Sequence, residues 1–189
     1  MRYHDLEKVV SNKIFTLLDV AKYFPNESEQ HIKIQLYRFT KQGLLTRLKR
    51  GVYTFPSSSH DELLVANTLY QPSYISLESA LNYYGIIPDI TQTVTSITRK
   101  KIGHITTPFG SFTYHQIKKS LYFGFYKVLS VEADEYYDIA QKEKALLDYF
   151  YIRKITNTDG LRLNLAKIDK KIYKMYLQKF PHWVQKIKI

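Results

Sequence analysis

The sequence contains no cysteine, and it has only 7 glycines and 6 prolines in 189 residues. The missing thiols exclude disulfide frameworks, thiolate zinc sites, iron–sulfur clusters and cysteine nucleophiles. Every apolar run is far shorter than the roughly 20 residues that cross a bilayer, so we expect no membrane partner. The first residues, MRYHDLEKVV, have no signal-peptide h-region. We therefore expect a cytoplasmic protein.

Motifs for cofactors, metals and catalysis are also missing. Neither GxxxxGK[ST] nor GxGxxG occurs, and the histidines form no HxH or HxxxH pair. Asp89 and Glu143-Lys144 only faintly resemble a restriction-type nuclease arrangement, because the Glu-x-Lys spacing is wrong. We predict no cofactor, no metal site, no catalytic residue and no enzymatic activity. A nuclease-like, nucleic-acid-processing enzyme targeted by a winged helix is the alternative.

Acidic residues are too few to balance the basic ones, and the net charge is +11. Residues 1–60 contain 10 Lys and Arg against 5 Asp and Glu, residues 61–150 contain 8 against 10, and residues 151–189 contain 10 against 2. The positive charge therefore lies at the two ends of the chain. A surface this basic attracts polyanions, of which nucleic acid is the commonest. A solvated basic face without a partner is the alternative.

The N-terminal residues predict three short helices followed by a hairpin. Residues 2–11 have the apolar spacing of a helix. A capping-box pattern at Thr16 begins a second helix, and Ser28 begins a third that ends at a glycine. Residues 44–48 and 52–55 read as strands joined by a tight turn. This order of elements is typical of a winged helix-turn-helix.

A run of small polar residues at Ser57–Ser59 marks the boundary between two predicted domains. Residues 1–57 are assigned to a winged helix-turn-helix DNA-binding domain. Residues 60–189 are assigned to a mixed α+β effector domain with a small antiparallel sheet and C-terminal helices. Its strands are expected at residues 91–99, 104–107, 111–116 and 121–129, and its helices at residues 60–70, 77–84, 140–153 and 165–180. The predicted fold class is α+β.

The third helix has two contrasting faces. Ile32, Leu36 and Phe39 share one arc, which we expect to be buried. The opposite face is rich in hydrogen-bond donors and carries Gln30, His31, Ile34, Tyr37, Arg38 and Lys41, with Lys33 on its flank. Arg and Gln form bidentate bonds to guanine and adenine, and an apolar side chain meets a thymine methyl group. The residues expected to read the major groove are Gln30, Ile34, Tyr37 and Arg38. An ordinary solvated face is the alternative.

The hairpin adds a second cluster of cations. Arg47, Lys49 and Arg50 lie beside its turn, where the wing of a winged helix touches phosphates or the minor groove. Together with Lys33 and Lys41, they are expected to hold phosphates and to set affinity and salt response. A charged tip that only keeps the hairpin soluble is the alternative. The predicted partner is double-stranded operator DNA, and an inverted repeat would need two protomers.

Three stretches of the chain resemble a known family. Residues 15–16, 36–45 and 48–53, which include LYRFTKQGLL and LKRGVY, look like the N-terminal winged helix of AbiEi-type antitoxins, the regulators of type IV toxin–antitoxin systems. Residues 74–85, YISLESALNYYG, resemble the Ser-x-x-Ser-Ala-Leu helix of that family. Residues 140–148, AQKEKALLD, resemble its Glu-Lys-Ala-Leu-x-Asp helix.

The resemblance implies a transcriptional repressor of its own operon that acts as an antitoxin in abortive infection. Its second domain would oppose a nucleotidyltransferase-like toxin without a stable complex. The resemblance ends near residue 155, and it leaves the role of the basic tail, residues 153–189, open. Within that tail, Lys167, Lys170, Lys171 and Lys174 are expected to form one basic ridge.

Overall fold

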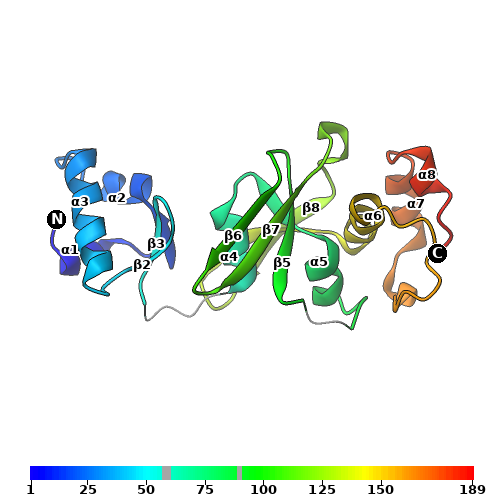
Figure 1. Cartoon of the computed structure of the whole chain (residues 1–189), viewed down its shortest axis with the longest axis horizontal. Coiled ribbons are helices and arrows are strands. Elements are labelled where there is room, and N and C mark those ends of the chain that lie inside the picture. The colour runs from blue at the N-terminus through cyan, green and yellow to red at the C-terminus, as the bar shows by residue number, and fades with distance from the viewer. Residues whose placement is uncertain (57–60, 89–90) are drawn as a thin grey trace.

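The computed structural model describes residues 1–56, 61–88 and 91–189. Figure 1 shows the N-terminal helices at one end of the molecule, a twisted sheet in the middle, and the C-terminal helices at the other end. The predicted boundary at Ser57–Ser59 and the candidate Asp89 lie outside the described residues. Within the described part of the chain, none of the helices is long and apolar enough to span a membrane.

The N-terminal part combines helices with a small antiparallel sheet. Its elements in chain order are α1 (Tyr3–Val9), β1 (Ile14–Thr16), α2 (Leu17–Tyr23), α3 (Glu29–Lys41), β2 (Thr46–Lys49) and β3 (Val52–Thr54). The three strands pair antiparallel in the order β1-β3-β2. The helices and strands predicted for this region are therefore confirmed, with small shifts at their ends.

Local capping interactions fix the ends of α2 and α3. The Thr16 hydroxyl accepts a hydrogen bond from the Asp19 backbone N–H at 3.2 Å, and Asp19 accepts one from the Thr16 N–H at 2.9 Å, which together form a capping box. Ser28 accepts a bond from the His31 N–H at 3.2 Å. Gly43, at φ +73°, ends α3 in a left-handed conformation. The short-range sequence signals were sufficient to predict these boundaries.

The second sheet is larger than predicted and is mixed in direction. It contains β4 (Ser73–Ile75), β5 (Thr93–Thr98), β6 (Gly103–Thr107), β7 (Gly110–Gln116), β8 (Phe125–Ser130) and β9 (Glu135–Ala140), in the order β6-β7-β5-β4-β9-β8. The β4–β9 and β5–β7 pairs are parallel. The prediction of a small antiparallel sheet was wrong in two respects: it missed β4 and β9, the strands that join the two halves of this sheet, and two of the predicted strands, β5 and β7, pair parallel.

Helices pack around this sheet and extend beyond it. They are α4 (Glu62–Leu69), α5 (Leu77–Tyr83), α6 (Lys142–Arg153), α7 (Lys170–Leu177) and α8 (His182–Gln185), with 3₁₀ turns η1 (Lys119–Leu121) and η2 (Leu165–Lys167). The prediction of one helix over 165–180 was wrong. The Asp169 side chain accepts bonds from the backbone N–H groups of Lys171 and Ile172, at 2.8 and 3.1 Å, so α7 begins anew there.

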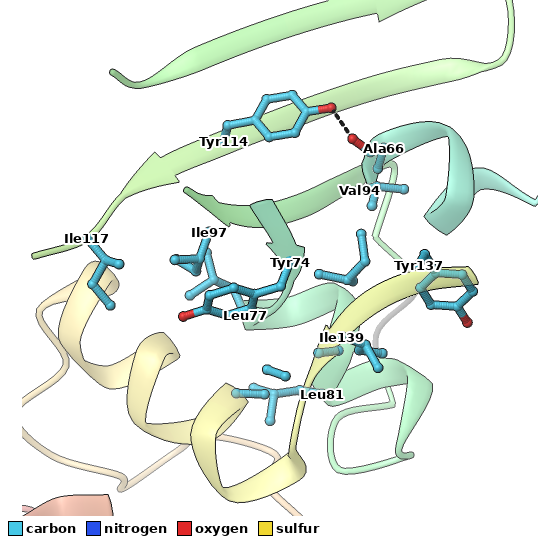
Figure 2. Close-up of a cluster of buried hydrophobic side chains, with 14 of the residues drawn as sticks. Ala66, Tyr74, Leu77, Leu81, Val94, Ile97, Tyr114, Ile117, Tyr137 and Ile139 are labelled. Carbon is cyan, nitrogen blue, oxygen red and sulfur yellow. Dashed lines mark hydrogen bonds between the residues drawn. The ribbon is translucent and has the colours of Figure 1, made fainter. Parts of the chain in front are cut away.

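The main hydrophobic core lies between the six-stranded sheet and its helices. Figure 2 shows Tyr74, Ile97 and Ile139 from three strands of the sheet meeting Leu77 and Leu81 of α5. At the edge of this cluster, the hydroxyl of the buried Tyr114 on β7 donates a hydrogen bond of 2.7 Å to the carbonyl of Ala66 in α4. The polar end of a large aromatic side chain is thus paired inside the core, as burial requires.

The N-terminal sheet is buried on both faces. Phe15 and Tyr53 face the helices of the N-terminal core. The alternate side chains, Ile14, Leu48 and Val52, belong to the main core instead. Because successive side chains in a strand point to opposite faces, this short sheet forms the layer between the two parts of the molecule.

Candidate nucleic-acid interface

The predicted faces of α3 are confirmed by the burial of its side chains. Ile32, Leu36 and Phe39 are buried in the N-terminal core. The seven side chains expected on the opposite face or its flank are all exposed: Gln30, His31, Lys33, Ile34, Tyr37, Arg38 and Lys41. Two of them are large and apolar or aromatic, with Ile34 42% and Tyr37 58% exposed. Helix α3 thus presents donors together with apolar contact groups to solvent.

A basin of about 860 Å³ lies between α3 and the β2–β3 hairpin. Its cationic and aromatic lining comes from both elements: Lys33, Tyr37 and Lys41 of α3, and Arg47 and Arg50 of the hairpin. Gly51 also lines it and holds φ at +79°, so the tight turn brings the backbone close to the surface. The structure therefore brings together five of the side chains that the sequence singled out.

Two contacts within the basin define its electrostatics. Lys33 forms an ion pair with Glu29 one turn earlier, with Nζ to Oε1 at 2.6 Å. The Lys41 ammonium lies 5.7 Å from the centre of the Tyr37 ring. The structure records no ion pair for the exposed Arg50 within the described residues. Arg50 and Lys41 therefore present cationic groups with which no carboxylate of the described residues pairs.

Four further predicted residues, Gln30, His31, Ile34 and Arg38, lie on α3 outside the lining of the basin. The His31 ring is engaged locally, with Nδ1 3.2 Å from Glu27 and Nε2 3.1 Å from the Gln35 amide. Gln30 and Arg38 are exposed, and the described part of the chain provides no side-chain partner for either. Their donors are free to bind an external group. Apart from Lys49, the predicted set thus divides into a basin and an adjoining strip of helix surface.

Lys49 is placed differently from the other cations. Its ammonium donates a hydrogen bond to the carbonyl of Leu69, the last residue of α4. A cation at the C-terminus of a helix is favourable because the carbonyl groups there carry partial negative charge. Burial, and to a lesser extent the nearby Lys100, lowers the pKa of Lys49. This side chain joins the hairpin to the second part of the molecule.

Sequence reasoning missed several residues that line the basin: Leu17, Glu29, Thr40 and Tyr53. The i,i+4 spacing of Glu29 and Lys33 was a usable signal for their ion pair. The Thr40 hydroxyl donates a bond of 2.8 Å to the Leu36 carbonyl, and this contact also follows from helical spacing. The contribution of Tyr53 depends on how the hairpin folds back, which no local pattern in α3 predicts.

A separate polar cluster lies in the main core, at the motifs that carry the family resemblance. Lys144 and Asp148 of α6 form a fully buried ion pair, and Asp148 accepts bonds from Tyr74 and Ser76 at 3.0 and 2.9 Å. Burial lowers the pKa of Lys144 and raises that of Asp148. Ser76 precedes α5, but its hydroxyl does not cap that helix and donates to Asp148 instead. All four side chains are fully buried, so the cluster is part of the core and not an accessible binding site.

Comparison with known proteins finds no matching family model and no significantly similar curated sequence. Among the residues that the structure describes, no group of three His, Cys, Asp or Glu side chains is arranged to hold a metal ion. The α3–hairpin surface is therefore the candidate site on the strength of its own geometry.

Proposed function

We propose that the chain is a sequence-specific DNA-binding repressor that acts as the antitoxin of a type IV toxin–antitoxin system. In this proposal residues 1–57 form a winged helix-turn-helix, with α3 as the recognition helix and the β2–β3 hairpin as the wing. The order α1-β1-α2-α3-β2-β3 and the β1-β3-β2 sheet support this assignment. A recognition helix of this kind enters the major groove while the wing contacts the neighbouring backbone.

The observation that carries the proposal is the convergence of α3 and the hairpin on one exposed, cationic surface. Lys33 and Lys41 from the helix and Arg47 and Arg50 from the hairpin line a single basin. Phosphates follow one another along a DNA strand, so a row of cations from two elements suits a duplex backbone. The second half of the chain leaves the α3 face exposed, and the surface is therefore open to a duplex.

The two parts of the surface suggest a division of labour. Gln30, Ile34 and Arg38 carry groups that can meet base edges, and they adjoin the basin on the same helix. The cations of the basin would hold phosphates and position the helix without reading sequence. In this division, Tyr37 is the residue shared by both parts, because it belongs to the predicted reading set and also lines the basin.

The antitoxin part of the proposal rests on the family resemblance. The two later stretches of the resemblance, residues 74–85 and 140–148, include α5 and the start of α6, which pack together in the main core and are linked through Ser76 and Asp148. The proposed partner is a nucleotidyltransferase-like toxin that is opposed without a stable complex. Co-expression tests this part: growth that the toxin arrests should recover when the full chain is produced.

DNA binding is tested with fluorescence anisotropy on a labelled duplex from the region upstream of the gene, at several salt concentrations. Arg38→Ala should weaken binding to this duplex by about 1 to 3 kcal/mol and should relax one base position. Arg50→Gln should weaken binding to specific and random duplexes alike, and should lower the salt slope by about 0.9. Lys8→Gln, an exposed lysine on α1, is the matched control and should change neither quantity.

Two outcomes would contradict the proposal. Equal losses for Arg38→Ala and Arg50→Gln on specific and random duplexes would remove the division between base reading and phosphate binding. No binding to any duplex at low salt would exclude the DNA interface altogether, and would favour a role for α3 in binding a protein.

A further inference from the structure

A second open pocket lies at the C-terminal end of the molecule, far along the chain from α3. It has a volume of about 510 Å³, within the range of small-molecule sites, and it is lined by Tyr151, Ile152, Lys154, Thr156 and Trp183. Helix α6 and the turn that follows it supply four of these residues, and α8 supplies the tryptophan. The pocket therefore combines two aromatic rings, one cation and the hydroxyl groups of Tyr151 and Thr156.

The aromatic rings form a supported platform. The rings of Tyr151 and Trp183 are stacked, with centroids 6.0 Å apart and planes 20° apart. Tyr151 in turn packs edge-on against the buried Phe180, at 5.9 Å. Trp183 nevertheless stays 36% exposed. An indole ring that is supported by a neighbouring ring and still partly exposed can stack on a further flat ring.

The C-terminal segment that lines this pocket is strongly positive. Residues 151–189 contain 10 Lys and Arg but only Asp159 and Asp169 as acidic residues. Both carboxylates are already engaged: Asp169 caps α7, and Asp159 accepts a bond of 2.7 Å from the Asn157 amide. Arg153 pairs with Glu78, at 2.6 Å, but Lys154 is exposed and has no recorded carboxylate partner in the described chain. An anionic ligand complements this end of the molecule.

We propose that this pocket binds an unpaired base of a single-stranded nucleic acid, with Trp183 as the stacking surface and Lys154 as a phosphate contact. Aromatic platforms beside cations are typical of single-strand binding, because every base has a flat face that can stack and every phosphodiester linkage carries a negative charge. A duplex does not fit this role, since its bases are already stacked on each other. The site is thus distinct from the proposed duplex site on α3, and it does not depend on it.

Trp183 is the single tryptophan of the chain, so its fluorescence reports on the pocket directly. The experiment titrates the full chain with oligo(U), with oligo(dT) and with a duplex, each about ten nucleotides long. Quenching by a single strand but not by the duplex is the expected result. The comparison of oligo(U) with oligo(dT) distinguishes RNA from DNA as the preferred strand.

Variants then locate the site by anisotropy of a labelled single strand. Trp183→Ala should weaken binding about tenfold, while Trp183→Phe should retain much of it. Lys154→Gln should lower the salt slope by about 0.7, the value for one phosphate contact on a single strand. Met175→Ala removes an exposed apolar side chain on α7 outside the pocket, and it should have no effect.

Three results would overturn this inference: fluorescence that no oligonucleotide changes, equal quenching by duplex and single strand, or unchanged affinity of Trp183→Ala. Fluorescence that responds to a protein partner but not to oligonucleotides would identify the pocket as a protein-docking surface instead. Binding of duplex DNA by Trp183→Ala checks independence, because the proposed duplex site predicts that it is retained.

Discussion

His115 lies on β7, where its imidazole is half-buried near Arg153 and Glu78. Burial lowers the pKa of His115 below its ordinary 6.5, the positive charge of Arg153 lowers it further, and Glu78 partly opposes both effects. The folded protein therefore takes up this proton less readily than the unfolded chain. As the pH falls below 6.5, His115 is protonated in the unfolded chain before it is protonated in the folded protein. The free energy of unfolding therefore decreases as the pH falls.

The prediction is that His115→Gln flattens the pH dependence of the free energy of unfolding below pH 6.5. Urea unfolding at a series of pH values from neutral downwards measures this for the native chain and the variant. His104→Gln is the control, because His104 is exposed on β6 and hydrogen-bonded locally to Thr106. If the free energy of unfolding of His115→Gln falls with pH as steeply as that of the native chain, the assignment is contradicted.

At the scale of single residues, the sequence predicted which side chains are buried or exposed better than it predicted which groups they contact. The amphipathic pattern of α3 identified Ile32, Leu36 and Phe39 as buried and the opposite side chains as exposed, since helical period alone decides this. The helical period could not predict the hydrogen bond of Lys49. Its partner, the carbonyl of Leu69, is 20 residues away, and only the packing of the two halves brings it near.

At the scale of elements, α6 contains a buried ion pair between Lys144 and Asp148. Removing one member is expected to destabilise the fold more than neutralising both, because it leaves a buried charge unpaired. Asp148 is fully buried and holds Lys144, Tyr74 and Ser76 together. Replacing Lys144 by Met leaves the Asp148 carboxylate without its cation in a low-dielectric core. We predict a loss of about 3 to 5 kcal/mol in the free energy of unfolding for Lys144→Met.

The second variant in this test is Lys144→Met combined with Asp148→Asn. Asparagine removes the buried charge but keeps an oxygen that accepts bonds from Tyr74 and Ser76. The double variant should therefore be more stable than Lys144→Met alone. Denaturant unfolding compares the two, and a double variant that is less stable than the single one would show that the charge itself contributes little.

The sequence predicted elements well where their ends carry local signals. The capping residues at Thr16 and Ser28 and the glycine at 43 set the boundaries of α2 and α3 through short-range bonds. Strand β4 has only three residues, between Pro72 and Ser76, and its identity depends on pairing with β5 and β9. Pairing over long distances is a property of the whole sheet, so period and propensity could not predict it.

At the scale of the whole molecule, the N-terminal sheet joins two cores. Ile14, Leu48 and Val52 are buried with residues of the second half. The backbone N–H of Lys13 also donates a bond of 2.8 Å to Glu135 at the start of β9. If the halves separated, these apolar side chains would be exposed to water, which opposes independent unfolding.

The prediction is one cooperative unfolding transition for the full chain. Trp183 fluorescence reports on the C-terminal end, and a Trp183→Phe, Phe24→Trp variant reports on the N-terminal core, where Phe24 packs. The two probes should give the same denaturant midpoint. Leu48→Asp places a charge in the shared layer and should separate the midpoints, whereas Leu18→Asp, at an exposed position on α2, should not. Different midpoints for the two probes without Leu48→Asp would mean that the shared layer does not couple the two cores. Each half would then unfold without exposing enough buried surface to destabilise the other.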